Sequence, residues 1–115
     1  GGMQKRVAIA RAIVNNPKYL FCDEPNSGLD PKTAIVIDNL IQEITKEYDI
    51  VTVINSHDMN SVMEIGEKIV FLKDGLNAWE GNKDTIFKTD NAAVTDFVYS
   101  SNLFKKVRKM YLGEL

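Results

Sequence analysis

Two short, continuously apolar segments place the strongest constraint on the fold of this chain. Residues 19–22 read Tyr-Leu-Phe-Cys, and residues 50–54 are β-branched at every position. Runs of this length and composition predict strands that are buried on both faces, as in a parallel sheet. Because a helical pattern separates the two runs, we predict an α/β fold in which strands and helices alternate through right-handed crossovers.

Amphipathic segments flank these strands. Residues 4–15 predict a helix that ends before Pro17, because proline disfavours helix in the residue before it. Residues 32–48 predict a second helix, with Asp30 as N-cap and Pro31 at the first helical position. The predicted buried faces are Val7, Ala8, Ala10, Ile13 and Val14 in the first helix and Val36, Ile37, Leu40, Ile41, Ile44 and Tyr48 in the second.

The remaining segments predict a hairpin followed by short helices. A short helix is expected over 59–65, and strands over 68–72 and 76–80 are joined by a turn at Asp74-Gly75. The composition changes after Gly81. We therefore expect an α/β core over residues 1–81 and a helical C-terminal extension over residues 82–115.

The C-terminal tail combines basic and apolar side chains. Lys105, Lys106, Arg108 and Lys109 alternate with Phe104, Val107, Met110 and Tyr111. Such a segment either packs on its own domain as an amphipathic helix or contacts acidic lipid headgroups or a partner subunit. Packing on its own domain is the favoured interpretation.

Composition narrows the classes of function. The 115 residues carry a formal net charge of -2, which argues against a dominant nucleic-acid-binding surface. The one cysteine, Cys22, excludes an internal disulfide and fits a reducing compartment. No apolar run approaches the roughly 20 residues that cross a bilayer, and no signal peptide pattern occurs. We therefore expect a cytoplasmic chain.

Polar clusters follow both predicted strands. Asp23 and Glu24 end the first strand, and Ser56, His57 and Asp58 follow the second. The carboxyl ends of neighbouring parallel strands share one edge of the sheet, where ligands bind. At such an edge an aspartate can hold Mg²⁺, a glutamate can orient or deprotonate a water, and a histidine can donate to a phosphate oxygen. The alternatives are a strand that simply ends at solvent and a structural histidine.

Gly1 and Gly2 stand before the first predicted helix, which starts near Gln4. The free N–H groups and positive dipole of a helix N-terminus attract phosphate, and glycines let the backbone approach an anion closely. The alternative is a flexible start without function.

In this order the motifs resemble the C-terminal half of an ABC-type ATPase. Residues 1–4, Gly-Gly-Met-Gln, are similar to the end of the family's signature motif, and residues 19–24 to its Walker B strand with the catalytic glutamate. Residues 27–30, Ser-Gly-Leu-Asp, resemble the D-loop, and His57 stands where the switch histidine belongs. The resemblance covers residues 1–81. It implies a RecA-like P-loop NTPase fold, with a mostly parallel sheet flanked by helices and closed by an antiparallel hairpin.

The resemblance also implies a site shared by two ATPase subunits that stack head to tail with ATP and Mg²⁺ between them. The strand-end residues would serve the nucleotide of their own chain, and the glycines would face the nucleotide of the partner. Glu24 and His57 are the implied catalytic residues; Gly1, Gly2, Gln4, Asp23, Ser27, Gly28 and Asp30 are the implied ATP-binding residues, with Asp23 also the metal ligand.

The departures from the family pattern concern its N-terminal half. The signature's Leu-Ser would precede Gly1, and no G-x-x-x-x-G-K-[ST] phosphate loop occurs in these residues. We therefore expect a fragment cut inside the signature motif that neither binds ATP tightly nor hydrolyses it. Unpaired strand edges and apolar faces are expected to make the fragment self-associate.

A narrower resemblance concerns the class of transporter. Residues 1–13, 23–31, 71–87 and 94–102 look like the ATPases of MCE-type (Mla-like) lipid transporters, with Phe97 and Val98 at apolar positions of the tail. This resemblance implies membrane-embedded permease partners, a location on the inner face of the cell membrane and no nucleic-acid partner. A generic importer or exporter ATPase carries comparable weight. One alternative class is an ABC-type ATPase of DNA repair or chromosome maintenance; in the chromosome class a coiled coil separates the two halves. Another is a regulatory or decayed fragment that only binds partners.

Overall fold

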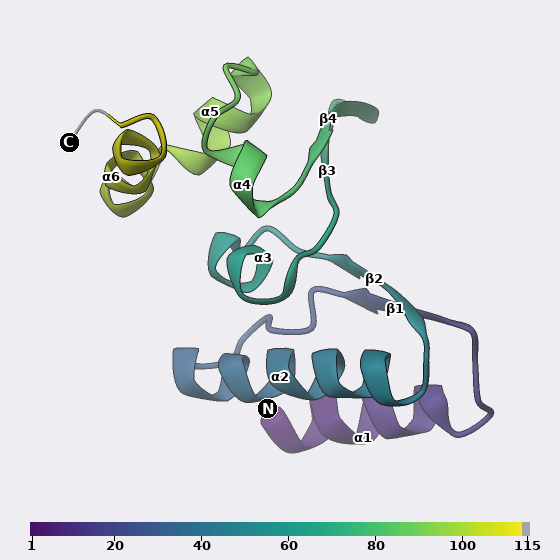
Figure 1. The fold of residues 1–115 in the computed structure, drawn as a ribbon. Coiled ribbons are helices and arrows are strands. Elements are labelled where there is room, and N and C mark those ends of the chain that lie inside the picture. Colours follow the sequence, from purple (N-terminus) through teal and green to yellow (C-terminus); the bar gives the residue numbers. More distant parts are fainter. Residues whose placement is uncertain (114–115) are drawn as a thin grey trace. The chain divides into compact units, whose positions relative to one another are not determined.

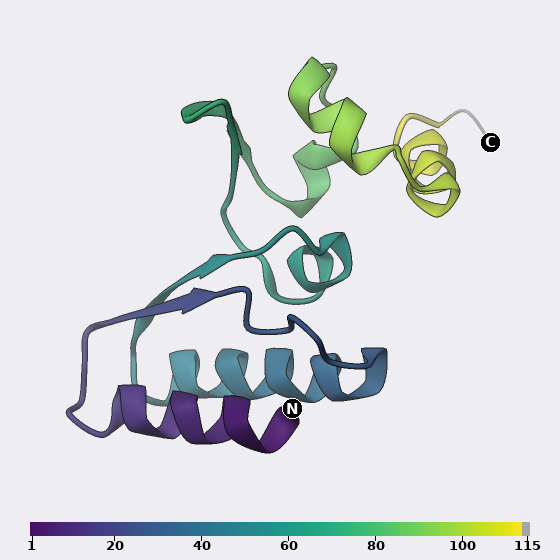
Figure 2. The same cartoon turned by 180° about the vertical axis from the view of Figure 1, so that it is seen from behind.

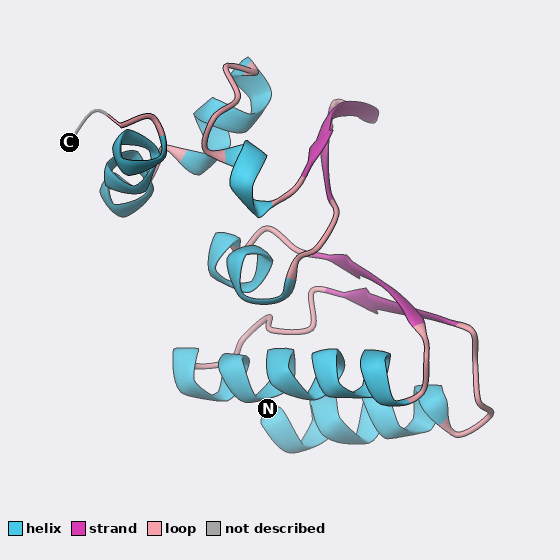
Figure 3. Cartoon of the chain, viewed as in Figure 1, coloured by secondary structure: helices cyan, strands magenta, loops and turns pink. Residues whose placement is uncertain are grey.

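The computed structural model describes residues 1–113, which divide into two compact units between Ile65 and Gly66. Figure 3 marks the helices and strands of both units. The first unit contains α1 (Gly2–Ile13), β1 (Tyr19–Asp23), α2 (Pro31–Glu47), β2 (Val51–Asn55) and α3 (Met59–Ile65). The second contains β3 (Ile69–Lys73), β4 (Leu76–Gly81), α4 (Lys83–Ile86), α5 (Ala92–Val98) and α6 (Asn102–Tyr111).

The first unit is built on a parallel pair of strands. β1 pairs with β2 so that Tyr19 lies opposite Val51 and Asp23 lies opposite Asn55. Helices α1 and α2 lie side by side along one face of this pair, as both Figure 1 and the reverse view in Figure 2 show. The parallel register confirms that the carboxyl ends of the two strands meet at one edge.

The core of this unit lies between the helices and the strands. Its buried members are Ile9, Leu20, Ile37, Ile41, Ile44 and Ile50. Burying a side chain of this size contributes about 1.5–3 kcal/mol relative to leaving it in water. The core therefore accounts for the docking of both helices on the strands.

The predicted face of α1 was wrong in part. Val7 and Val14 are 54% and 72% exposed, and Ala8 and Ala10 are exposed as well. Ile13 is half-buried against the core as predicted, and Ile9, which was not predicted, is buried. Residues four apart lie one above the other on a helix, so the Ile9–Ile13 ridge excludes positions on other sides of the helix from the contact. In α2, the predicted stripe is confirmed except at its flanks, where Val36 and Tyr48 are exposed.

The prediction that both strands are buried on two faces was also wrong for the described chain. Leu20 is buried, whereas Tyr19, Phe21, Val51 and Val53 are 50–74% exposed. Successive strand residues point to opposite faces, and α1 and α2 cover only the face that bears Leu20. The other face of β1 and β2 is an uncovered apolar surface.

The predicted hairpin forms a sheet of its own. β3 pairs with β4 in antiparallel register, so the predicted third strand does not extend the β1–β2 pair. Asp74 and Gly75 have φ values of 53° and 75° at the turn between the two strands. Two consecutive positive φ values are the requirement of a tight two-residue hairpin turn, and Asp-Gly meets it with little strain.

The helices of the second unit pack around Phe87, which is 1% exposed. Its ring lies 5.9 Å from that of Phe104 and 5.2 Å from that of Tyr111, both on α6. Arg108 of α6 also forms an ion pair with Asp90 at 2.8 Å. The basic tail therefore packs on its own unit, as the sequence favoured. None of the helices over residues 1–113 is long and apolar enough to span a membrane.

Candidate functional site

The centre of the candidate site is a contact between Glu24 and His57. Nδ1 of His57 lies 2.8 Å from Oε1 of Glu24, so the carboxylate accepts the Nδ1–H. The His57 side chain is 79% exposed and that of Glu24 is 33% exposed. The hydrogen bond to Glu24 and its charge raise the pKa of His57, with a smaller contribution from Asp58. The site therefore pairs an acid with a histidine at the open edge of the strands.

Asp23 occupies the same edge. Its Oδ1 accepts a hydrogen bond of 2.8 Å from Nδ2 of Asn55 on the neighbouring strand, and its side chain is exposed. Residues 1–113 contain no group of three or more acidic, histidine or cysteine side chains that could enclose a metal. Mg²⁺ is usually held by one or two carboxylates together with phosphate oxygens rather than by an all-protein cage. Asp23 fits that mode of binding.

The backbone at Glu24 has an uncommon conformation. Its φ of 46° lies in the left-handed region, which costs a non-glycine residue of order 1–3 kcal/mol. Two backbone hydrogen bonds hold it there: its N–H donates to the carbonyl of Asn55 at 2.7 Å, and its carbonyl accepts from Ser27 at 3.1 Å. Strain of this kind is concentrated at functional sites.

The predicted phosphate-facing end of α1 lies against the D-loop side of the unit. Gly1 is the N-cap and carries no side-chain cap, and a Cβ placed on it would lie 3.5 Å from Leu29. A Cβ placed on Gly2 would lie only 2.8 Å from Cγ2 of Thr33. Gly2 therefore permits a close approach of α1 to the start of α2. Gln4 lies on the exposed surface of α1.

The D-loop residues surround the N-terminus of α2. Asp30 caps this helix: its carboxylate accepts from Thr33 N at 3.1 Å and from Thr33 Oγ1 at 2.6 Å. These hydrogen bonds lower the pKa of Asp30, and they confirm the cap that the sequence predicted. Ser27 and Gly28 are exposed, and Gly28 has a φ of 75° that favours glycine.

The structure thus assembles the predicted residues in two groups. Asp23, Glu24 and His57 meet at the strand ends, whereas Gly1 and Gly2 lie beside the D-loop. The D-loop connects the two groups, because the N–H of its Ser27 donates to the carbonyl of Glu24 at 3.1 Å.

Three polar residues beside the site were missed, of which Asp38 and Ser61 are buried and Asn26 is half-buried. Asn26, Asp38 and Ser61 form a hydrogen-bonded cluster, and Asp38 is 3% exposed. Asp38 precedes Ile41 by three residues and therefore shares its face of α2. A charged residue on the apolar stripe of a helix was the signal that could have revealed the cluster.

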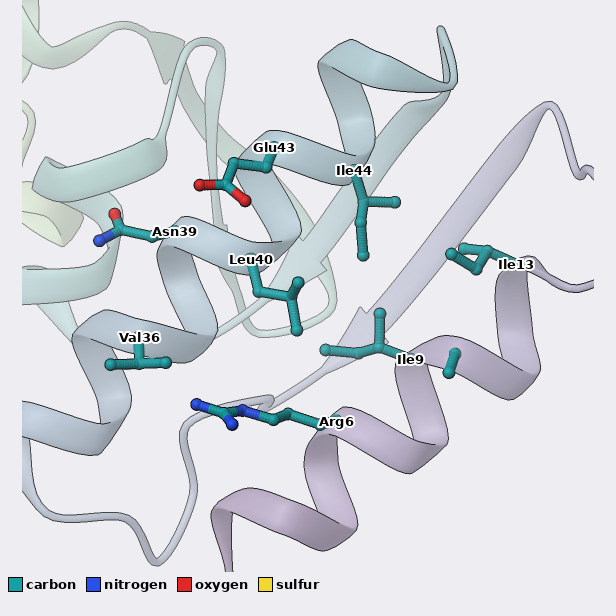
Figure 4. A pocket seen from close by; sticks show the side chains of 9 residues that line it. Arg6, Ile9, Ile13, Val36, Asn39, Leu40, Glu43 and Ile44 are labelled. Atoms are coloured by element: carbon teal, nitrogen blue, oxygen red, sulfur yellow. The ribbon is translucent and has the colours of Figure 1, made fainter.

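A groove of about 520 Å³ runs between α1 and α2, away from the predicted site residues (Figure 4). Ile9 and Leu40 point toward one another within it, and Arg6 and Glu43 contribute the charged groups of its lining. None of the residues that line it belongs to the predicted nucleotide site.

Comparisons with known proteins agree with the resemblance. The family profile described as "ABC transporter" matches residues 1–27. The methionine import ATP-binding protein MetN of Latilactobacillus sakei subsp. sakei (strain 23K) is 41% identical over 103 residues, covering 90% of this chain and 30% of that protein. MetN of Campylobacter jejuni subsp. jejuni is 40% identical over 102 residues, with 89% and 30% coverage. The chain thus spans about 30% of the length of these curated relatives.

Solved structures give the same result for the fold. A dimeric ATP-binding cassette in a post-hydrolysis state, bound to ADP and Pi, has a TM-score of 0.63 and 41% identity and covers 70% of this chain and 34% of its own. A nucleotide-free cassette from an ABC transporter has a TM-score of 0.66, covers 92% and 38%, and at 24% identity supports the fold alone. The predicted α/β P-loop NTPase class is therefore confirmed. By sequence and by fold, the chain is similar to part of an ABC transporter ATP-binding domain.

Proposed function

We propose that the chain is the C-terminal part of the ATP-binding subunit of an ABC transporter. The complete subunit couples ATP hydrolysis to transport, whereas this chain by itself is inactive because its residues include no phosphate loop. The observation that carries this proposal is the contact of Glu24 with His57 at the carboxyl edge of the β1–β2 pair. The similar import ATP-binding proteins support transport, and they do not favour the alternative of DNA repair or chromosome maintenance.

In this proposal the strand-end residues perform the chemistry. Glu24 orients and deprotonates the attacking water. Because Nδ1 of His57 is engaged by Glu24, the other ring nitrogen, Nε2, is the atom that meets a phosphate oxygen. Asp23 holds the Mg²⁺ ion, which when bound neutralises charge on the phosphate oxygens.

The site is completed by a second subunit in head-to-tail arrangement. The solved cassette with 41% identity is dimeric, which supports this arrangement. The free N–H groups at Gly1 and Gly2 would then face the phosphate of the partner's ATP, where the helix dipole favours an anion. Gln4 extends this surface along α1, and the D-loop residues Ser27, Gly28 and Asp30 cross between the subunits.

The transported substrate and the cellular position belong to the same proposal. The permease partners lie in the membrane, and the ATPase lies on its inner face in the cytoplasm. The resemblance to MCE-type ATPases favours a lipid as the transported substrate. The similar MetN proteins are named as methionine import proteins, which favours methionine instead. Purifying the transporter with its permease and identifying bound molecules by mass spectrometry decides between these substrates. The division into a core over 1–81 and an extension over 82–115 also stays a proposal.

The test is Glu24→Gln in the complete ATPase subunit that contains this chain. We expect ATP binding to be retained and turnover to fall by about 10²–10⁴-fold, the usual contribution of a general base. Glu43→Gln, which removes an exposed carboxylate on α2, is the control and should leave turnover unchanged. Unchanged turnover in Glu24→Gln would remove Glu24 from its proposed role.

A further inference from the structure

A buried polar cluster lies beside the candidate site, made of Asn26, Asp38 and Ser61. Nδ2 of Asn26 donates to Oδ1 of Asp38 at 2.6 Å, and Oγ of Ser61 donates to Oδ2 of Asp38 at 3.0 Å. Asn26 also donates to Oγ of Ser61. Asp38 and Ser61 are 3% and 4% exposed, so both oxygens of one carboxylate are used inside the protein.

Burying the polar groups of this cluster costs free energy, because they lose their contacts with water. Burial raises the pKa of Asp38, and the nearby charges of Asp58 and Glu64 act in the same direction, against the hydrogen bonds from Asn26 and Ser61. The structure also leaves Oδ1 of Asn26 buried without a partner among the described residues. Apolar side chains of similar volume often replace buried polar groups at no loss of stability. A role in positioning accounts for the cluster better than a role in stability does.

The three residues come from three separate segments, two of which carry site residues. Asn26 lies two positions after Glu24, in the turn that leads into the D-loop. Ser61 lies four positions after His57, in the first turn of α3. Asp38 projects from α2 and bonds to both.

Short backbone connections link each end of the cluster to the site. On one side, Ser27 N donates to the carbonyl of Glu24 at 3.1 Å. On the other side, the N–H of Asp58 donates to Oγ of Ser56 at 3.0 Å, and the N–H of Val62 donates to the carbonyl of Asp58 at 3.2 Å. These hydrogen bonds connect the residue after Asn26 to Glu24, and the residue after Ser61 to the residue after His57.

We propose that Asp38, with Asn26 and Ser61, is a positioning residue that ties the segment of Glu24 and the D-loop to the segment of His57 and keeps these two side chains in contact. The claim that the cluster connects the two segments depends on its hydrogen bonds alone. Its consequence for ATP hydrolysis rests on the proposed function.

The test uses His57, the single histidine of the chain, whose ring protons give an isolated NMR titration curve. The whole chain is titrated in magnesium-free buffer, and Glu24→Gln sets the scale, because it removes the main cause of the raised His57 pKa. Ser61→Ala and Asn26→Ala are expected to lower the His57 pKa by at least about half of the shift that Glu24→Gln produces. Ser61→Thr retains the hydroxyl group, so the His57 pKa in this variant should equal that of the natural chain.

The matched control is Thr45→Val. It breaks the 2.6 Å hydrogen bond between Thr45 of α2 and Thr52 of β2, which lies in the same unit and is also partly buried. It should lower the free energy of unfolding and leave the His57 pKa in place. A His57 pKa unchanged in both alanine variants overturns the proposal, and so does an equal shift in Thr45→Val.

Asp38→Asn keeps the volume of the side chain and supplies the same test if the alanine variants do not fold. It removes one of the two acceptors, so it should also lower the His57 pKa, and an unchanged value overturns the proposal. Under the proposed function, Ser61→Ala in the complete subunit lowers kcat and leaves the KM for ATP unchanged. If Glu24→Gln leaves ATP turnover intact while the NMR shifts occur, the proposed function fails and the positioning role stands.

Discussion

Nδ1 of His57 lies 2.8 Å from Oε1 of Glu24, although 33 positions separate the two residues in the sequence. Parallel pairing explains the contact. Asp23 lies opposite Asn55 at the ends of β1 and β2, so the residues that follow each strand leave from the same edge. Antiparallel pairing would have sent them to opposite ends of the strand pair.

This contact makes the free energy of unfolding depend on pH. Glu24 raises the pKa of His57 above its ordinary value of 6.5, so protonated His57 stabilises the folded state. That contribution is fully present below about pH 6.5 and is lost as the pH rises through the folded-state pKa. We expect urea unfolding to show a stability difference between the natural chain and Glu24→Gln that shrinks over this range. A difference that is constant with pH would contradict the prediction.

Gly2→Ala tests the close approach of α1 to α2. The new Cβ would lie 2.8 Å from Cγ2 of Thr33, and Thr33 cannot turn away without breaking its 2.6 Å bond to Asp30. We expect a loss of about 1 kcal/mol in the free energy of unfolding, at the low end for overpacking. Adding Thr33→Ser, which retains the hydroxyl and removes the methyl group, should recover most of the loss. No recovery in the double variant would mean that crowding is not the cause.

Two isoleucines of α2 provide a matched test of the core. Ile41 is 1% exposed, whereas Ile35 on the same helix is 49% exposed. Ile41→Ala should lower the free energy of unfolding by about 2–5 kcal/mol, because it removes buried area and leaves a cavity. Ile35→Ala should change it by less than about 1 kcal/mol. Equal losses, measured by chemical denaturation, would show that the helix is docked on a different face.

The uncovered face of β1 and β2 predicts self-association of the 115-residue chain. Phe21 and Val53 lie directly opposite one another on this face and are 74% and 50% exposed. Light scattering over a concentration series should give a mass above that of the monomer, because exposed apolar patches favour association. Phe21→Lys should shift the mass toward the monomer, whereas Tyr48→Lys, at the exposed C-cap of α2, should not. A monomer mass at every concentration would exclude this interface.

Local patterns were sufficient for most of the secondary structure. The apolar runs predicted β1 and β2, the sequence Asp30-Pro31 predicted the start of α2, and Asp74-Gly75 predicted the hairpin turn. Each of these signals acts within a few residues, through side-chain periodicity, a cap or a positive φ. The same patterns did not reveal which side of α1 faces the core, because Val7 and Ile9 are both apolar.

The sequence by itself determined the α/β class and the position of Asp23, Glu24 and His57 at one edge of the strands. The reason is that the carboxyl ends of neighbouring parallel strands lie at the same edge, so the polar residues that end them lie there too. Tertiary structure alone decided that one face of the strands is covered and that the hairpin forms a separate sheet. It also decided that Asp38 joins Asn26 and Ser61 beside the site. Those outcomes depend on contacts between segments that are distant in the chain, and the energy of such contacts is set by the packing of whole elements rather than by any local pattern.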